Sequence, residues 1–446
     1  MTADHELLDR RDFLRLGTLA GAGFFASRFP RWLKEPLLPS VDKLTPGPEL
    51  GYDPYSEKFD TMWGYSAVRG INNKTLLVLT DINPGIETRV KYKVLNENTD
   101  PDPAYGFNLS VPGLAQHSGY VASYARPDHF VAATLGVNAS GKFEFWAQKI
   151  KSDGSLLNEP QLLLGEITLM PFMFEIAPNP NGQESMIVWY CNYPAGYRGA
   201  IVSSTGELKA NIPAIEKVKI YQNYEQPVVN YNPNTGAYDI VWFQTEDPDV
   251  RNKGELCIAS INSDGSYYME PKVLDTWIHY GSKLFTAPDG DVFLALTRAT
   301  ALGNEIVVTK YKDPKDIEPG NFQIIDQGIW DIFRDPDISL KDDQIIMAWT
   351  TLVVTDFGME VHVIRMRTFD KDLNPVSDVT QITPTEDGQN RDIPIIVPDG
   401  GFCTVLYRSP YDYEGRYGSP QGRHITKEED NTSYNYLPLA LRSPGT

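Results

Sequence analysis

The feature that most constrains the fold of this 446-residue chain is a β-rich segment that recurs at a near-constant spacing. The clearest copies are 184–190, 238–243 and 344–349, and weaker copies are 74–80, 130–135, 291–296 and 401–407. Alignment of the seven copies on the tryptophan of the clearest ones gives Leu79, Thr134, Trp189, Trp242, Ala295, Trp349 and Leu406. The steps between these positions are 55, 55, 53, 53, 54 and 57 residues. A regular period of this size indicates a repeat architecture.

One repeat is clear enough to be divided into strands. The β-rich runs 226–231, 238–244, 255–261 and 272–274 are separated by turn signals such as Asp264-Gly265. Four short strands per repeat are typical of a propeller blade. The sequence therefore predicts an all-β fold, a seven-bladed β-propeller of four-stranded antiparallel blades with a repeat of about 53–57 residues.

The ends of this propeller are less well defined by the sequence. The first blade is predicted from residue 62 to about residue 114, and the last from residue 391 onward, with its outermost strand at 434–441. Six or eight blades are alternatives at these weaker ends. A pair of β-sandwiches is the rival architecture, but it predicts no constant period along the whole chain.

Composition narrows the classes of partner and cofactor. The formal net charge of -19 argues against nucleic acid, whose phosphates such a surface would repel. The three cysteines have no metal-ligand spacing, and we expect all of them to be buried thiols: Cys191, Cys257 and Cys403. No metal site is predicted. Ca²⁺ is a candidate cofactor for aspartate-rich loops such as 100–102 and 247–249, although aspartate and proline favour solvated turns, which is the preferred interpretation of these loops.

The N-terminal residues 1–30 resemble a twin-arginine export signal. Arg10-Arg11 is followed by Phe13-Leu14 and then by an apolar run rich in glycine and alanine. An amphipathic helix would explain the apolar residues but not the paired arginines. The resemblance implies export to a periplasmic, cell-surface or extracellular location. The apolar run is too short for a stable membrane span, and the signal could be cleaved or kept as an anchor.

The next segment is rich in proline and precedes the predicted ring. Residues 31–58 are expected to form a tether, with one strand near 37–41 that pairs onto the ring, because prolines disfavour helices and central strands. The propeller is then predicted to occupy 59–446.

Candidate site residues cluster at one point of the repeat, where each innermost strand begins and lines the channel mouth. The predicted ligand-binding residues are Trp63, Tyr65, His117, Tyr120, Tyr224, Arg334 and Arg391. The candidate catalytic residues are Glu225, Asp335, Asp392, His279 and Tyr280. Blade three contributes Phe172, Phe174 and Glu175 at the same point. Aromatic faces with a few fixed polar groups suit a sugar ligand, although any hydrated channel mouth is polar.

Two arginines in this set have a more specific interpretation. Arg334 and Arg391 lie on adjacent blades and could clamp a carboxylate in a fork geometry. The alternative is that they form ion pairs with the neighbouring Asp335 and Asp392.

Phe333-Arg334-Asp335-Pro336 resembles a motif of fructan- and arabinan-cleaving propeller glycosidases. The resemblance implies that Asp335 stabilises a transition state. Those families have five blades, and their first motif, with an Asn-Asp-Pro-Asn core, is absent here. The arginines near strand ends also give a distant similarity to sialidase-like propellers, without the Ser-x-Asp-x-Gly-x-Thr-Trp box of that group: Arg69, Arg126, Arg334, Arg391 and Arg408. No specific family is matched.

Three functions are consistent with these patterns. The first is an exported propeller whose channel mouth binds a carbohydrate or other extracytoplasmic polymer, with or without catalysis. The second is a glycoside hydrolase or polysaccharide lyase that uses acids, histidine and tyrosine at the mouth. The third is a redox propeller, for which the sequence offers no ligand set. The oligomeric state is left open.

Overall fold

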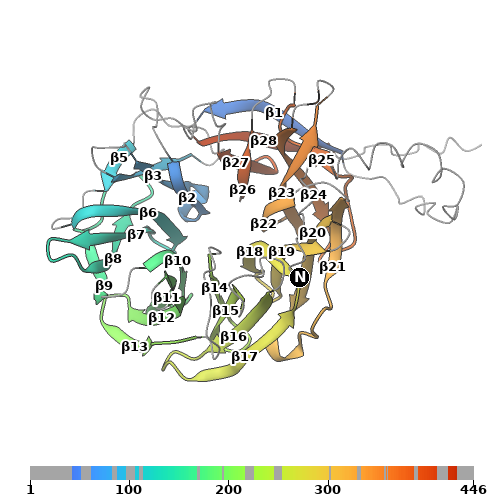
Figure 1. Cartoon of the computed structure of the whole chain (residues 1–446). Helices are drawn as coiled ribbons and strands as arrows, with labels where there is room; N and C mark the ends of the chain where they lie inside the picture. Colours follow the sequence, from blue (N-terminus) through green and yellow to red (C-terminus); the bar gives the residue numbers. More distant parts are fainter. Residues whose placement is uncertain are drawn as a thin grey trace, which may run out of the picture. The chain divides into compact units, whose positions relative to one another are not determined.

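The computed structural model describes residues 43–51, 62–82, 88–96, 106–109, 114–167, 171–192, 195–215, 226–245, 254–300, 303–328, 333–355, 358, 360–385, 390–408 and 420–428. These residues form seven four-stranded antiparallel sheets around a central axis (Figure 1). The part of the chain described contains no α-helix and only two single-turn 3₁₀ helices, η1 (Ile71–Asn73) and η2 (Pro314–Asp316). The predicted seven-bladed β-propeller is confirmed.

In blades one to six the strands follow chain order from the innermost outward (Figure 1). The first three blades are β2 (Met62–Arg69), β3 (Thr75–Ile82), β4 (Thr88–Leu95) and β5 (Gly106–Leu109); β6 (Leu114–Ala125), β7 (Phe130–Asn138), β8 (Phe143–Ile150) and β9 (Gln161–Ile167); and β10 (Pro171–Pro178), β11 (Glu184–Asn192), β12 (Ala195–Ser203) and β13 (Leu208–Ile212). The next three are β14 (Val228–Asn232), β15 (Ala237–Gln244), β16 (Glu255–Ile261) and β17 (Tyr267–Asp275); β18 (Ile278–Thr286), β19 (Val292–Thr300), β20 (Gly303–Tyr311) and β21 (Gln323–Gly328); and β22 (Phe333–Lys341), β23 (Gln344–Val354), β24 (Glu360–Phe369) and β25 (Thr380–Gln381).

Blade seven joins the two ends of the described chain. Its inner strands are β26 (Asp392–Pro398), β27 (Cys403–Arg408) and β28 (Pro420–Glu428), and its outer strand is β1 (Lys43–Gly51). β1 runs antiparallel to β28, with a register shift between Pro46 and Glu49. Two prolines are tolerated in β1 because an edge strand has one side free of ladder hydrogen bonds. The ring is therefore closed by hydrogen bonds between segments that are distant in sequence.

This closure differs from the expectation for the ends of the ring. The outer position of blade seven, predicted for 434–441, is occupied by β1, and 434–441 lies outside the described residues. β1 falls inside the segment 31–58 predicted as a tether, just after the strand predicted at 37–41. The propeller therefore includes residues before position 59. The predicted export signal, 1–30, lies outside the described residues.

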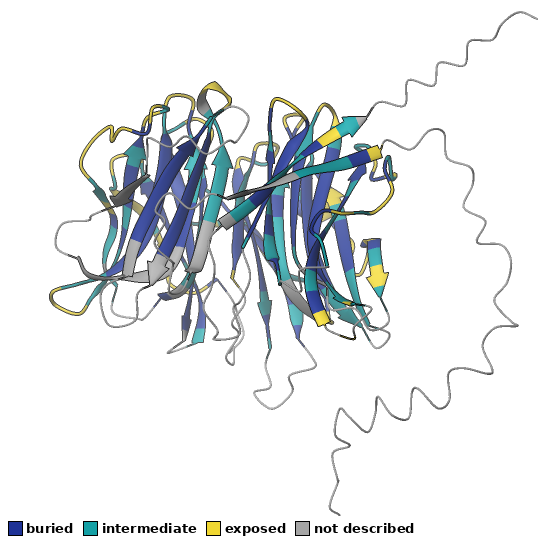
Figure 2. Ribbon diagram, turned by 90° about the horizontal axis from the view of Figure 1, so that it is seen from above, coloured by how far each residue is buried: buried dark blue, intermediate teal, exposed yellow. Residues whose placement is uncertain are grey.

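The hydrophobic core lies between neighbouring blades, where buried residues occupy the middle of the strands (Figure 2). Trp189 packs against Phe145 of blade two with ring centroids 5.4 Å apart, and Trp242 packs against Tyr197 of blade three at 6.1 Å. Trp349 belongs to a cluster that includes residues of blade five. Each tryptophan thus fills the boundary with the preceding blade.

The aligned positions differ from this arrangement in two blades. Ala295 packs toward blade six, whereas its neighbour Leu296 faces blade four. Leu406 packs toward blade one, whereas Tyr407 faces blade six. Leu296 and Tyr407 are therefore the structural equivalents of the tryptophans. The one-residue error arises because these strands are buried on both faces and so lack an alternating pattern.

Cys191, Cys257 and Cys403 are free, buried thiols, as expected. Burial raises the pKa values of the Cys257 and Cys403 thiols. A high thiol pKa keeps these side chains unreactive. No helix among the described residues is long and apolar enough to cross a membrane.

Candidate functional site in the central channel

The innermost strands of all seven blades line one cavity at the centre of the ring, with a volume of about 440 Å³. These strands are β2, β6, β10, β14, β18, β22 and β26, which lie nearest the axis in Figure 1. A cavity of this size is in the range of ligand-binding pockets. The central channel is therefore the candidate site.

Three charged side chains in this channel lie at the same level of the repeat. Glu175 of β10 pairs with Val188, one residue before Trp189, and Asp337 of β22 pairs with Ala348, one residue before Trp349. Lys283 of β18 pairs with Ala295, one residue before Leu296. Their strand positions are thus equivalent, and blades three, five and six present charges at one height of the channel.

Lys283 and Asp337 form a loose ion pair across a blade boundary. The Lys283 Nζ lies 3.8 Å from the Asp337 Oδ1, too far for a hydrogen bond. Asp337 is held in place because its Oδ2 accepts a hydrogen bond of 2.6 Å from the backbone N–H of Ile396 in blade seven. The Asp337 side chain is only 8% exposed, whereas that of Lys283 is 45% exposed. The ammonium group therefore reaches into the open part of the channel.

Glu175 is oriented by the neighbouring blade. Its Oε2 accepts a hydrogen bond of 3.2 Å from the Gln226 side chain, which also donates to the Phe174 carbonyl oxygen at 2.9 Å. Its Oε1 accepts from the backbone N–H of Ile176 at 3.3 Å.

The enclosed position of these groups changes their proton affinities. Desolvation raises the pKa of Glu175 and the pKa of Asp337, although Lys283 lowers both. For Lys283, desolvation lowers the pKa, but the attraction of Asp337 and Glu175 outweighs it and the net direction is upward. The amine therefore stays protonated at neutral pH. The two carboxyls keep their protons to a higher pH than ordinary glutamate and aspartate side chains do.

Further polar contacts join adjacent blades along the channel wall. The Ser66 and Ser123 hydroxyls lie 2.8 Å apart between blades one and two, and Asn230 donates to Thr286 Oγ1 at 2.7 Å between blades four and five. These contacts link the inner strands of adjacent blades along the channel wall.

Most of the predicted mouth residues are described only in part. Trp63 and Tyr65 lie on β2, His117 and Tyr120 on β6, His279 and Tyr280 on β18, and Arg334 on β22, and for these the structure describes the backbone alone. Tyr224 and Glu225 lie outside the described residues. The described positions are all in innermost strands, as predicted.

Asp335 is brought close to the predicted residues of blade five. It has a left-handed backbone with φ of 50°. A Cβ atom on Gly281 would lie 2.9 Å from both the Cα and the Oδ1 of Asp335. Glycine at 281 thus permits a close approach between blades five and six, next to His279 and Tyr280.

Arg391 and Asp392 do not form the predicted arrangement. Arg391 is only 1% exposed, and its backbone N–H donates to the His362 carbonyl oxygen at 3.0 Å. The side chain of Asp392 pairs with Arg408 through two contacts of 2.8 and 2.5 Å, not with Arg391. Because Arg391 is buried, its side chain is not accessible to a ligand. The predicted clamp therefore lacks one of its two arginines.

Lys283 and Asp337 were missed by the sequence analysis, which considered only strand starts. A signal was available, because both are charges within strands that are otherwise suited to burial, as in Lys283-Leu284-Phe285. Charged groups are rarely buried without a partner, so an isolated charge in such a strand points to a polar channel.

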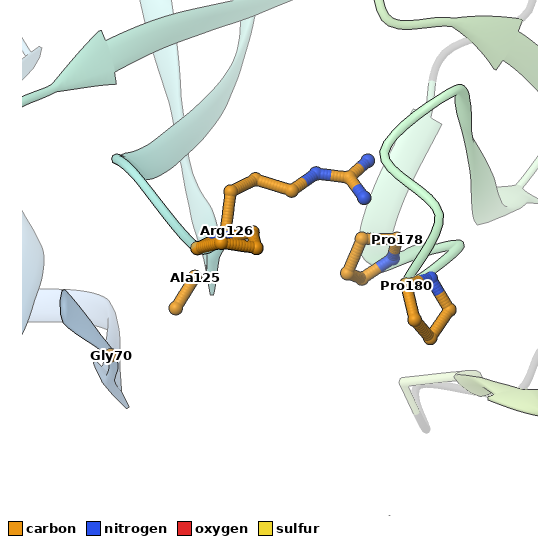
Figure 3. Close-up of a pocket in the computed structure, with 6 residues that line it drawn as sticks. Gly70, Ala125, Arg126, Pro178 and Pro180 are labelled. Carbon is orange, nitrogen blue, oxygen red and sulfur yellow. The ribbon is translucent and has the colours of Figure 1, made fainter.

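A second cavity of about 480 Å³ lies where the innermost strands of blades two and three end (Figure 3). Arg126 points across it toward the turn that follows Pro178. Its guanidinium donates to the carbonyl oxygens of Asn179 and of Glu184, the latter at 3.1 Å. This arginine is therefore engaged in joining two blades.

Among the described residues, no group of three or more His, Cys, Asp or Glu side chains could hold a metal ion. The candidate calcium loops 100–102 and 247–249 lie outside those residues.

Comparison with known proteins gives no family. No family model matches the chain, and no curated protein matches it. Solved structures with a similar fold include a polysaccharide lyase, Uly1, at 8% identity and a TM-score of 0.40, covering 86% of this chain and 100% of that one. An α-L-arabinofuranosidase from Fusarium graminearum, solved with an iminosugar inhibitor, has 9% identity and a TM-score of 0.42, covering 85% and 98%. An endo-arabinase from Bacteroides thetaiotaomicron has 18% identity and a TM-score of 0.37, covering 55% and 89%. At these levels of similarity the function must be argued from the site itself.

Proposed function

We propose that this protein is an exported β-propeller that binds a carbohydrate or other extracytoplasmic polymer at its central channel. The observation that carries the proposal is the channel cavity of about 440 Å³, into which a half-exposed charged side chain projects. Enclosed cavities with a few fixed polar groups are the usual form of ligand sites. Hydrogen bonds between the inner strands of adjacent blades support a preformed site.

Binding can be tested with a glycan array followed by calorimetry on the hits. Glu175→Gln should weaken binding because it removes a charged acceptor from the channel wall. Asp264→Asn, in an exposed turn after β16, removes a carboxylate away from the channel and should leave binding unchanged. Absence of binding to every glycan tested would contradict a carbohydrate ligand at the channel.

A carbohydrate-active enzyme, either a glycoside hydrolase or a polysaccharide lyase, is the second candidate. It is favoured by the upward pKa shifts of Glu175 and Asp337, because a raised pKa makes a carboxyl better suited to act as a general acid. The wild-type protein should then cleave a glycan that it binds, and Asp337→Asn should abolish cleavage while the glycan still binds. If this variant cleaves the glycan as fast as the wild-type protein does, Asp337 is not the general acid.

A further inference from the structure

We propose that the channel selects an uncharged, hydroxyl-rich sugar unit, with Lys283 as its hydrogen-bond donor and Glu175 and Asp337 as its acceptors. Sugars that carry a carboxylate or an amine at this position would be rejected. This inference rests on the proposed binding function and adds the chemical class of the ligand.

Lys283 supplies the donor side of the site. An ammonium group has three N–H donors. None of the described residues accepts a hydrogen bond from Lys283, and Asp337 approaches it only to 3.8 Å. With 45% of its side chain exposed, Lys283 can donate to a ligand oxygen inside the channel.

The acceptor side comes from two carboxylates on other blades. Asp337 Oδ2 is used by the Ile396 N–H, which leaves lone pairs on the Oδ1 that faces Lys283. Glu175 accepts from Gln226 and from Ile176, and each carboxylate oxygen can accept two hydrogen bonds. Donor and acceptors therefore line the same cavity at the same level of the repeat.

A hydroxyl group matches this arrangement better than a charged group does. It can accept from the ammonium and donate to a carboxylate, so neither kind of protein group is left unpaired. A ligand carboxylate would satisfy Lys283 but face Glu175 and Asp337, and a ligand ammonium would face Lys283. An unpaired or repelled charge in a partly desolvated site is costly, and such costs create specificity.

The charge of the surroundings gives no compensation for a charged ligand. The residues that line the cavity include two cationic side chains, Arg69 and Lys283, and two acidic ones, Glu175 and Asp337, so the wall is balanced. The net charge of -19 on the whole chain further disfavours the approach of an anionic polymer.

The ligand class can be tested with matched oligosaccharides. Neutral gluco-, xylo- and manno-oligosaccharides would be compared by calorimetry with 2-amino-2-deoxy and uronate oligomers of the same length and linkage. A neutral oligomer should bind at least about tenfold more tightly than its charged counterparts. If charged oligomers bind as well or better, the inference fails while the binding function stands. If no oligomer of any charge binds, the proposed carbohydrate binding itself fails.

Variants separate the role of Lys283 from a general effect of charge. Lys283→Met keeps the length of the side chain but removes the donors, and it should weaken neutral-sugar binding by at least about tenfold. Lys312→Met, whose parent side chain is 63% exposed in the turn after β20, makes the same charge change away from the channel and should bind like wild type. Asp337→Asn leaves a local excess of positive charge and should improve binding of the uronate oligomer. Melting temperatures would be measured for all three, and unchanged sugar binding by a folded Lys283→Met would overturn the inference.

Discussion

At the scale of single residues, the tryptophans at the blade boundaries are among the largest buried side chains of the described residues. Trp189, Trp242 and Trp349 are at most 4% exposed and contact the preceding blade. Replacing each one with alanine should cost about 3–5 kcal/mol of unfolding free energy, because each leaves a large cavity. Denaturant unfolding would measure this. Trp277→Ala, at a site 44% exposed, should change the stability far less, and equal losses at all four sites would contradict the packing argument.

A buried acid makes the stability depend on pH. Burial raises the pKa of Asp239 to about 6, even though Ser260, Asn232 and Tyr311 donate hydrogen bonds to it. In the unfolded chain the carboxyl of an aspartate has a pKa of about 3.9. Between these two pKa values the folded state binds more protons than the unfolded state does. The unfolding free energy therefore falls as the pH rises through this range, and it stays lower above about pH 6.

The direction of this pH dependence can be checked with Asp239→Asn, whose side chain cannot ionise. The unfolding free energy of the variant, followed from about pH 4 to pH 6, should lack the downward slope attributed to Asp239. Asp264→Asn, in an exposed turn, should keep that slope. An identical slope in wild type and Asp239→Asn would show that this carboxyl does not titrate there.

At the scale of elements, the strand that completes blade seven and closes the ring is β1. Leu44 of β1 is 4% exposed and belongs to the core cluster shared with blades six and seven. Leu44→Asp would place a charge in this cluster and should destabilise the ring by about 3 kcal/mol or more. Leu208→Asp also alters an outer strand, but at a site 48% exposed, and should have little effect. Thermal unfolding of both variants would test the difference.

The strands that could be predicted are those that carry a local signal. Tryptophans and glycine-containing turns define blades three and four, and their predicted strands agree with β11, β15 and β16. The register slipped at Ala295 and Leu406, where no large side chain identifies the position. β1 was not predicted as part of blade seven, because pairing with β28 depends on a contact that no local pattern encodes.

The candidate site was predictable in position but not in its residues. The prediction that innermost strands line a channel agrees with the cavity, and Glu175 was among the residues at the expected point. The predicted arginine clamp was not found, because sequence position does not show that Arg391 is buried or that Arg408 pairs with Asp392. Lys283 and Asp337 meet only because blades five and six are adjacent in the ring.

At the scale of the whole molecule, the destination of the chain is a separate prediction. Arg10→Lys together with Arg11→Lys should leave the protein in the cytoplasm, because lysine keeps the charge but removes the twin-arginine pattern. Cell fractionation followed by immunoblotting would locate it. Normal export of the double variant would contradict a twin-arginine route.

The closure of blade seven also has a consequence for how the protein is made. A ribosome produces β1 before any other described strand, yet its partner β28 is made last among them; Gly47 and Arg423, which are hydrogen-bonded across the seam, are 376 residues apart. Domains that complete early in synthesis can fold while translation continues. This ring cannot, because its first strand must wait for its last. A product truncated before β28 would leave β1 without its partner strand, so the ring would stay open.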